Sequence, residues 1–144
     1  MIFNLRKIEL KDSPLLFEWV NDFSTRKNSF NSEEVKLKEH QIYIQNMLES
    51  QTKNQYILEI DNIPIGTIKD NILKDYIEIS YALSPLARGK KLSSILMNLY
   101  LVNKTGKFLC KIKTNNIPSI KMVERCGFTL DKIIDKIGYY ILEK

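Results

Sequence analysis

The segment from residue 76 to residue 97 constrains the fold of this chain most, because its pattern changes twice over a short distance. Residues 76–83 (YIEISYAL) are β-branched and aromatic and predict a strand. Leu92, Ile95 and Leu96 recur at helical spacing and predict a helix. A strand, a short turn and a helix in this order direct backbone N–H groups and a helix N-terminus to one place, which suits a phosphate.

The turn between them, residues 84–91 (SPLARGKK), is basic. Pro85 fixes the exit from the strand, and Gly89 allows the backbone to turn tightly. Arg88, Lys90 and Lys91 add positive charge where a pyrophosphate would lie. The residues alone are equally consistent with an ordinary strand-to-helix connection whose basic turn is solvated.

Length and composition predict one soluble globular domain over residues 1–144, with 44% hydrophobic and 27% charged residues. No apolar run is long enough for a membrane span, and the N-terminus lacks the order of a signal peptide, so we expect a cytoplasmic protein. Cys110 and Cys126 lack metal-ligand spacing and are expected to be free thiols, with no metal bound. The net charge of +5 is compatible with an anionic ligand, but the lysines are scattered, so no nucleic-acid or membrane partner is expected.

The rest of the chain predicts a mixed, mostly antiparallel sheet flanked by helices, which is an α+β fold. Residues 21–32 read as an irregular, polar segment. Strands are predicted at residues 3–8, 56–60, 63–68, 107–113, 128–134 and 138–142, and helices at residues 11–20, 38–50 and 119–126.

The irregular segment is a candidate binding loop, because Arg26 lies there among Asn and Ser residues. The alternative is that Phe23 and Phe30 simply attach the loop to the core. His40 is the only histidine and follows this segment at the start of a helix. It is a candidate for the substrate site, although a single histidine is often a surface or cap residue.

Two patterns carry a resemblance to a known family. Residues 81–93 (YALSPLARGKKLS) resemble the acetyl-CoA-binding segment of the GNAT superfamily of N-acetyltransferases, and residues 116–128 (NIPSIKMVERCGF) resemble its later Asn, Ser and Gly-Phe pattern. The resemblance implies the GNAT fold, acetyl-CoA as co-substrate, and a pantetheine arm that pairs with residues 81–83 between two splayed strands. The cofactor-binding residues that it implies are Tyr81, Ala82, Leu83, Arg88, Gly89, Lys90, Lys91, Leu92, Ser93, Asn116 and Ser119.

The sequence departs from the family pattern in two places. In the turn, Lys91 replaces a glycine, and Ser93 replaces a glycine or alanine. Many members also carry a tyrosine seven residues after the Asn, where it protonates the leaving thiolate. That position is Val123 here, so another group or solvent must supply the proton.

A finer resemblance covers the first third of the chain. Residues 19–22 (WVND) and 25–30 (TRKNSF), followed by His40, are similar to the GNAT branch that acetylates nucleotide-linked 4-amino-4,6-dideoxy sugars, such as the pseudaminic-acid pathway enzyme. An arginine can bind phosphate and amides can bind sugar hydroxyls. The substrate-binding residues that this resemblance implies are Asn21, Arg26, Asn28, Ser29, Phe30 and His40.

We therefore expect an acetyl-CoA-dependent N-acetyltransferase in which the amine attacks directly in a ternary complex. Glu78 and His40 are the candidate bases, although Glu78 fits an outward-facing strand residue nearly as well. Tyr81, Tyr139 and Tyr140 are the candidate acids, and Tyr139 is carried forward with the two bases as a predicted catalytic residue. The alternatives are a protein N-terminus or another small amine as acceptor, or a non-catalytic acyl-CoA-binding module. A monomer or a homodimer is expected.

Overall fold

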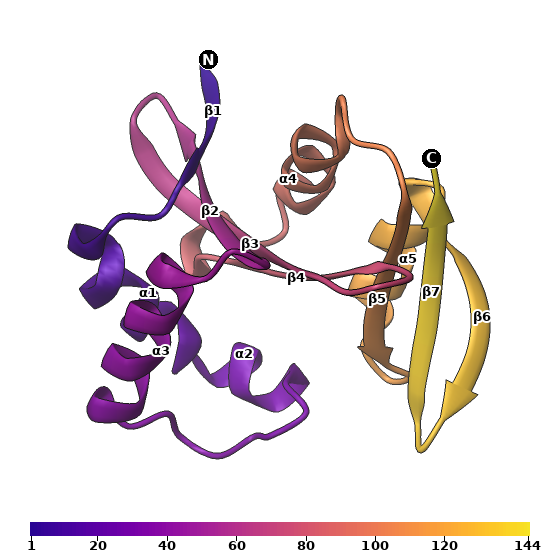
Figure 1. The fold of residues 1–144 in the computed structure, drawn as a ribbon, viewed down its shortest axis with the longest axis horizontal. Helices are drawn as coiled ribbons and strands as arrows, with labels where there is room; N and C mark the ends of the chain where they lie inside the picture. Colours follow the sequence, from indigo (N-terminus) through magenta and orange to yellow (C-terminus); the bar gives the residue numbers. More distant parts are fainter.

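A seven-stranded sheet in the order β1-β2-β3-β4-β5-β7-β6 runs through the computed structural model, which describes residues 1–144 (Figure 1). All neighbouring strands are antiparallel except β4 and β5, which are parallel. The predicted α+β fold with a mostly antiparallel sheet is confirmed. The strands are β1 (Phe3–Lys7), β2 (Lys53–Ile60), β3 (Ile63–Ile72), β4 (Ile77–Leu83), β5 (Lys107–Lys113), β6 (Thr129–Ile134) and β7 (Ile137–Glu143).

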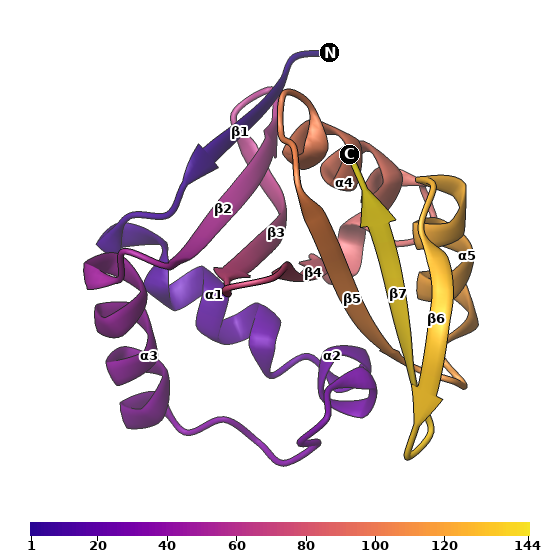
Figure 2. The same ribbon diagram turned by 45° about the vertical axis from the view of Figure 1, so that its right-hand side comes forward.

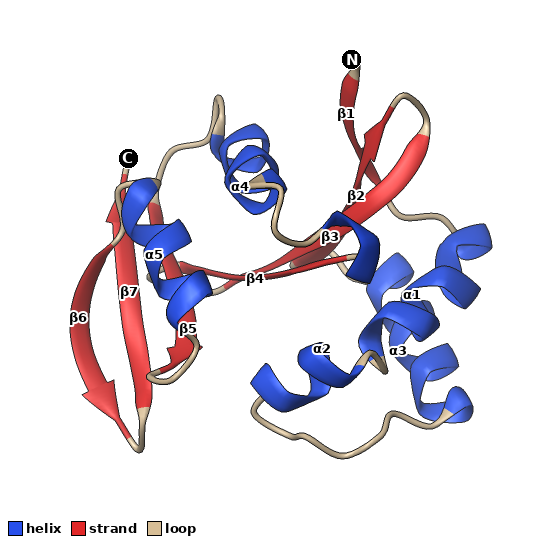
Figure 3. Cartoon of the chain, turned by 180° about the vertical axis from the view of Figure 1, so that it is seen from behind, coloured by secondary structure: helices blue, strands red, loops and turns tan.

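Helices cover both faces of the sheet. The helices α4 (Leu92–Leu101) and α5 (Ile117–Arg125) lie on one face, as the view from behind in Figure 3 shows. On the other face lie α1 (Ser13–Val20), α2 (Phe23–Asn28) and α3 (Leu37–Glu49). No helix is long and apolar enough to cross a membrane.

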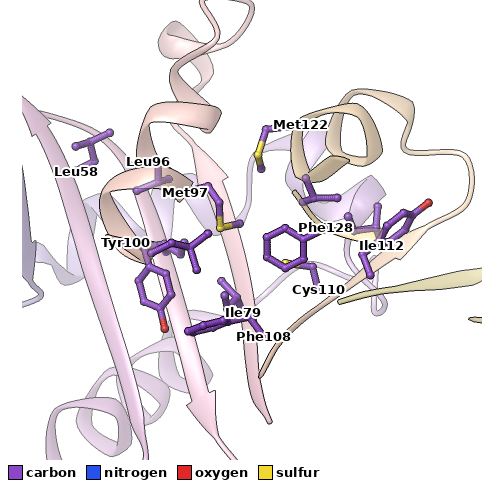
Figure 4. Close-up of a cluster of buried hydrophobic side chains, with 14 residues drawn as sticks. Leu58, Ile79, Leu96, Met97, Tyr100, Phe108, Cys110, Ile112, Met122 and Phe128 are labelled. Atoms are coloured by element: carbon purple, nitrogen blue, oxygen red, sulfur yellow. The ribbon is translucent and has the colours of Figure 1, made fainter. Parts of the chain in front are cut away.

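Each face of the sheet has its own hydrophobic core. Fourteen buried residues of the sheet, of α4 and α5 and of the segment after α5 form the larger core. Leu96, Met97 and Tyr100 of α4 are completely buried in it (Figure 4). A smaller cluster of six joins α1 and α3 to the sheet, with Trp19 and Ile44 among its members. Because successive strand residues face opposite ways, Ile57 belongs to the small cluster and Leu58 to the large one.

Two hairpins form where the sequence predicts them. The β2–β3 turn is Asp61-Asn62, with φ values of 51° and 68°, and the β6–β7 turn is Asp135-Lys136, with φ values of 51° and 64°. Both turns use the left-handed region at two successive residues, which matches the twist of the adjoining strands. Asp and Asn adopt this conformation more readily than most residues.

The segment predicted to be irregular contains a short helix, α2. Asp22 caps it, since its carboxylate accepts a hydrogen bond from the Thr25 N–H at 3.3 Å. None of the six helical residues is buried, so no apolar periodicity marked this helix in the sequence.

The strands β4 and β5 pair only at their N-terminal ends, where Ile77 is opposite Phe108 and Glu78 is opposite Leu109. Beyond these residues they separate, so the sheet forms two groups of strands that meet where β4 and β5 pair (Figure 2). The gap opens at the C-terminal ends of both strands. The turn before α4 and the start of α5 lie at that end.

A buried polar contact fastens α4 to the sheet. The completely buried Tyr100 donates its hydroxyl hydrogen to the Asp70 carboxylate, which also accepts from the Asn54 amide at 2.9 Å. We expect Tyr100→Phe to lower the free energy of unfolding by about 1–3 kcal/mol, because one oxygen of a buried carboxylate loses its donor while the ring packing is kept. Urea unfolding measures this change.

Tyr56→Phe is the matched control, since Tyr56 lies against Tyr100 but its hydroxyl makes no hydrogen bond within the chain. We expect this variant to stay within about 0.5 kcal/mol of the original protein. Equal losses in the two variants would show that the hydroxyl contact with Asp70 does not stabilise the fold.

Candidate active site

The turn before α4 presents unpaired backbone N–H groups. Gly89 has a φ of 77°, and Lys91, which precedes the first residue of α4, has φ 59° and ψ 21°. None of the N–H groups of Gly89, Lys90 and Lys91 donates a hydrogen bond within the chain, and no side chain caps the helix. Successive free N–H groups at a helix start form a concave anion site, so this turn fits the pyrophosphate of the predicted co-substrate.

Lys91 keeps the backbone conformation that glycine favours. Its left-handed φ and ψ cost roughly 1 kcal/mol for a residue with a Cβ, and glycine adopts them without this cost. The departure of the sequence at this position therefore changes the side chain but not the path of the turn. The side chains of Lys90 and Lys91 are exposed and form no ion pair, so both ammonium groups are free to approach a phosphate.

The end of β4 has a free edge. The Ser84 N–H donates to the Ile65 carbonyl of β3, and hydrogen-bonded positions alternate along an antiparallel pair. Ala82 is therefore directed toward β3, whereas the N–H groups of Tyr81 and Leu83 face the gap beside β5. An extended chain placed in this gap has two backbone donors on β4 with which to pair.

Arg88 is held by the segment that precedes α2. Its guanidinium lies 2.7 Å from the Asp22 carboxylate and donates to the Thr25 hydroxyl at 3.2 Å and to the Leu83 carbonyl at 3.3 Å. The hydrogen bond from Arg88 holds the pKa of Asp22 below its usual value. The side chain of Arg88 thus joins the turn to α2 rather than standing free for a phosphate, and the sequence did not indicate Asp22 as its partner.

The first turns of α4 and α5 contribute further polar groups. Leu92 and Ser93 begin α4 and are half-buried, and the buried Ser94 hydroxyl has no hydrogen-bond partner, a feature that the sequence analysis missed. Asn116 precedes α5, and its side-chain amide makes no hydrogen bond within the chain. Ser119 is buried and its hydroxyl lies 2.7 Å from the Tyr81 hydroxyl.

The face of the sheet opposite to α4 and α5 carries a carboxylate with lysines near it. Glu78 of β4 lies 2.9 Å from the Lys111 ammonium of β5, and this hydrogen bond raises the pKa of Lys111. Tyr139 of β7 lies between Lys111 and Lys132, whose ammonium groups are 5.5 Å and 5.1 Å from its ring centroid. These four residues and Lys69 of β3 form a surface that we call the lysine face.

Lys69 is exposed to solvent, yet protein surrounds it on most sides. This desolvation lowers its pKa, and the charges of Arg26 and Lys53 act in the same direction. Its ammonium lies 5.0 Å from the ring centroid of Tyr43. The helix α2 also comes close to this face, because the Lys113 ammonium of β5 donates to the Lys27 carbonyl at 2.9 Å.

The predicted substrate-binding loop is held together by its own polar residues. Arg26 donates to the carbonyls of Val20, Asn31 and Glu33 and to the Ser29 hydroxyl, at 2.7–3.1 Å. The Asn21 side chain pairs with both the N–H and the carbonyl of Val35 at 2.8 Å. Asn21, Arg26 and Ser29 therefore shape the loop from within.

The exposed members of this predicted set are Asn28 and Phe30. Asn28 ends α2, and Phe30 is 58% exposed. Neither Phe30 nor Phe23, which is 79% exposed, attaches the loop to the core. The structure leaves these side chains accessible to a partner.

His40 is buried between α3 and α1, behind the Tyr43 ring that lies next to Lys69. Its Nε2 donates to the Ser13 carbonyl at 3.0 Å, and its ring packs against Phe17 and Tyr43. Burial lowers the pKa of His40. This placement is that of a core residue that joins two helices, and it does not favour the predicted catalytic and substrate-binding roles.

A family profile described as an acetyltransferase (GNAT) domain matches residues 3–129. No curated relative matches the chain by sequence. No group of three or more His, Cys, Asp or Glu side chains is placed to hold a metal ion.

Solved structures share the whole fold at low identity. A spermidine N-acetyltransferase from Vibrio cholerae, in complex with CoA and spermine, has a TM-score of 0.86 at 16% identity over 98% of this chain and 95% of its own. The aminoglycoside acetyltransferase AAC(6')-Ib, in complex with coenzyme A and kanamycin, has a TM-score of 0.83 at 20% identity over 99% and 95%. RimL, a ribosomal L7/L12 alpha-N-protein acetyltransferase in complex with coenzyme A, has a TM-score of 0.79 at 17% identity over 98% and 93%.

Proposed function

Because the chain belongs to the GNAT acetyltransferase family, and is thus an N-acetyltransferase that uses acetyl-CoA, we propose that its acceptor is a nucleotide-linked 4-amino-4,6-dideoxy sugar of the pseudaminic-acid type. The observation that carries this proposal is the charge of the lysine face. Lys111 pairs with the Glu78 carboxylate there, the charge of Lys69 also interacts with it, and Lys132 lies beside Tyr139, as Lys111 does. Lysine ammonium groups bind phosphate, and a nucleotide-linked sugar carries two phosphates across the sugar ring from its 4-amino group.

The same charge argues against a polycationic acceptor. Two of the similar structures hold spermine or kanamycin, which carry several amines. Such a molecule would meet three lysines and one carboxylate on the lysine face of this chain. Like charges at short range disfavour binding, so an anionic acceptor fits this surface better.

The transfer is proposed to be direct, from acetyl-CoA to the amine in a ternary complex. An acyl-enzyme route needs an activated nucleophile, and burial raises the pKa values of both Cys110 and Cys126, so their thiols stay protonated. The Glu78 carboxylate is the proposed base, which takes a proton from the attacking amine, directly or through a water molecule. One of the two N–H groups that face the gap, that of Tyr81 or of Leu83, is proposed to donate to the developing oxyanion.

A panel of amine acceptors tests the proposal, with thiol release from acetyl-CoA as the measurement. We expect kcat/KM for the nucleotide-linked amino sugar to exceed that for the same sugar without the nucleotide by about 100-fold or more, because the free sugar lacks the phosphates that the lysines bind. The panel also includes spermidine and a short peptide with a free N-terminus.

The free amino sugar is the matched control, since it presents the same amine without the charge. Faster turnover of spermidine or of the peptide would replace the proposed acceptor with another amine. Binding of acetyl-CoA with no turnover on any acceptor would instead contradict the proposal that the lysine face binds an acceptor for acetyl transfer.

A further inference from the structure

A hydrogen bond spans the gap between the two splayed strands. The Tyr81 hydroxyl of β4 lies 2.7 Å from the hydroxyl of Ser119 in the first turn of α5. Tyr81 is three residues beyond Glu78, the last residue of β4 that pairs with β5, and α5 follows β5. A group that enters between the strands therefore meets the Tyr81 hydroxyl.

The two other tyrosines considered as acids, Tyr139 and Tyr140, do not lie at the gap between β4 and β5. Tyr139 is on the opposite face of the sheet, between Lys111 and Lys132. Tyr140 is 6% exposed in the large core and is on β7, beyond β5 from the gap. Val123, where many relatives have a tyrosine, is completely buried and has no proton to donate.

We propose that Tyr81, oriented by Ser119, donates the proton that the sulfur of coenzyme A takes up when it leaves. This inference rests on the proposed acetyl transfer. The amine forms a bond to the carbonyl carbon of the thioester and loses one proton to Glu78 or water. The C–S bond breaks with its electron pair on sulfur, the Tyr81 O–H bond breaks, and an S–H bond forms. The Tyr81 phenolate regains a proton from solvent, either directly or through the Ser119 hydroxyl, which leaves free CoA thiol and the acetylated amine.

The pKa of Tyr81 leaves the phenol protonated at neutral pH, so its O–H is present when the thiolate forms. Burial raises the pKa of Tyr81 to about 12, although the Ser119 hydrogen bond opposes this shift. Because the phenol is the protonated form below its pKa, the donor is available at neutral pH and is lost only as the pH rises toward 12. The first turn of α5 adds positive potential near the Tyr81 oxygen, which stabilises a transient negative charge there.

The test uses coenzyme A alone, so it does not depend on the acceptor. The ultraviolet absorbance of the thiolate is followed against pH for coenzyme A bound to the protein. A phenol that donates to sulfur stabilises the thiolate, so we expect the bound thiol of Tyr81→Phe to ionise about one pH unit higher than in the original protein. In a separate assay, with whichever amine of the panel turns over, its kcat should fall by about 100-fold or more, while the Kd for acetyl-CoA from calorimetry changes by less than about threefold.

Two further variants sharpen the result. Tyr140→Phe removes a phenol from the core and should leave the thiol titration unchanged, whereas Ser119→Ala should shift it in the same direction as Tyr81→Phe but by less. An unshifted titration in Tyr81→Phe, with coenzyme A bound at the original affinity, would overturn the role of Tyr81. A wrong acceptor would change the amine panel and leave this titration unaffected.

Discussion

The Gly89→Glu variant is expected to keep its fold and lose about 100-fold or more in affinity for coenzyme A. A Cβ at residue 89 would meet no atom within 4 Å, so the new side chain has room. Its carboxylate, however, would lie beside the free N–H groups of Gly89, Lys90 and Lys91, where the pyrophosphate is expected. Calorimetric titration with acetyl-CoA measures the loss.

Gly89→Ala is the matched control, because it places a Cβ on the same left-handed backbone without adding a charge. At a φ of 77° this costs about 1 kcal/mol of stability, and affinity should fall by less than about tenfold. Equal affinities for the two variants would show that charge near this turn does not matter, and the pyrophosphate would have to be placed elsewhere.

Features of the fold that depend on a few neighbouring residues could be predicted from the sequence. The strand, turn and helix around Gly89 were predicted because strand composition, a glycine and helical periodicity each act over a few residues. The turns at Asp61-Asn62 and Asp135-Lys136 follow from the same kind of local preference. The left-handed conformation of Lys91 was not predictable from the lysine itself, since only the surrounding turn imposes it.

The partners of charged side chains were harder to predict, because they depend on contacts between distant segments. Arg88 pairs with Asp22, which lies much earlier in the chain, and Arg26 donates to nearby backbone carbonyls. The sequence indicated both arginines as candidate binding residues, but it could not distinguish a donor held by the protein from one left free. His40 illustrates the same limit, because its buried partner is a backbone carbonyl.

The ion pair between Arg88 and Asp22 also connects the turn before α4 to α2. One guanidinium contacts the end of β4 through the Leu83 carbonyl and the start of α2 through Asp22 and Thr25. The turn assigned to the pyrophosphate is therefore fastened to the helix that borders the lysine face. This single side chain therefore joins the elements against which the two proposed substrates are expected to bind.

The second large effect is expected from Glu78→Gln, which should lower kcat by about 100-fold or more while the Kd for acetyl-CoA stays within about threefold. The amide oxygen can still accept the hydrogen bond that Lys111 makes to Glu78 at 2.9 Å, so the geometry of the pair is kept. The amide cannot take a proton from the amine. Steady-state kinetics at saturating acetyl-CoA, together with calorimetric binding, separates this loss of chemistry from a loss of binding.

Glu59→Gln makes the same chemical change at a carboxylate that also faces a cation, Arg6 at 3.3 Å, but on β2 and away from the lysine face. We expect its kcat to match that of the original protein. Glu78→Asp should retain more activity than Glu78→Gln, because a carboxylate remains. If Glu78→Gln turned over as fast as the original protein, proton removal would belong to solvent, and Glu78 would act only as the partner that orients Lys111 on the lysine face.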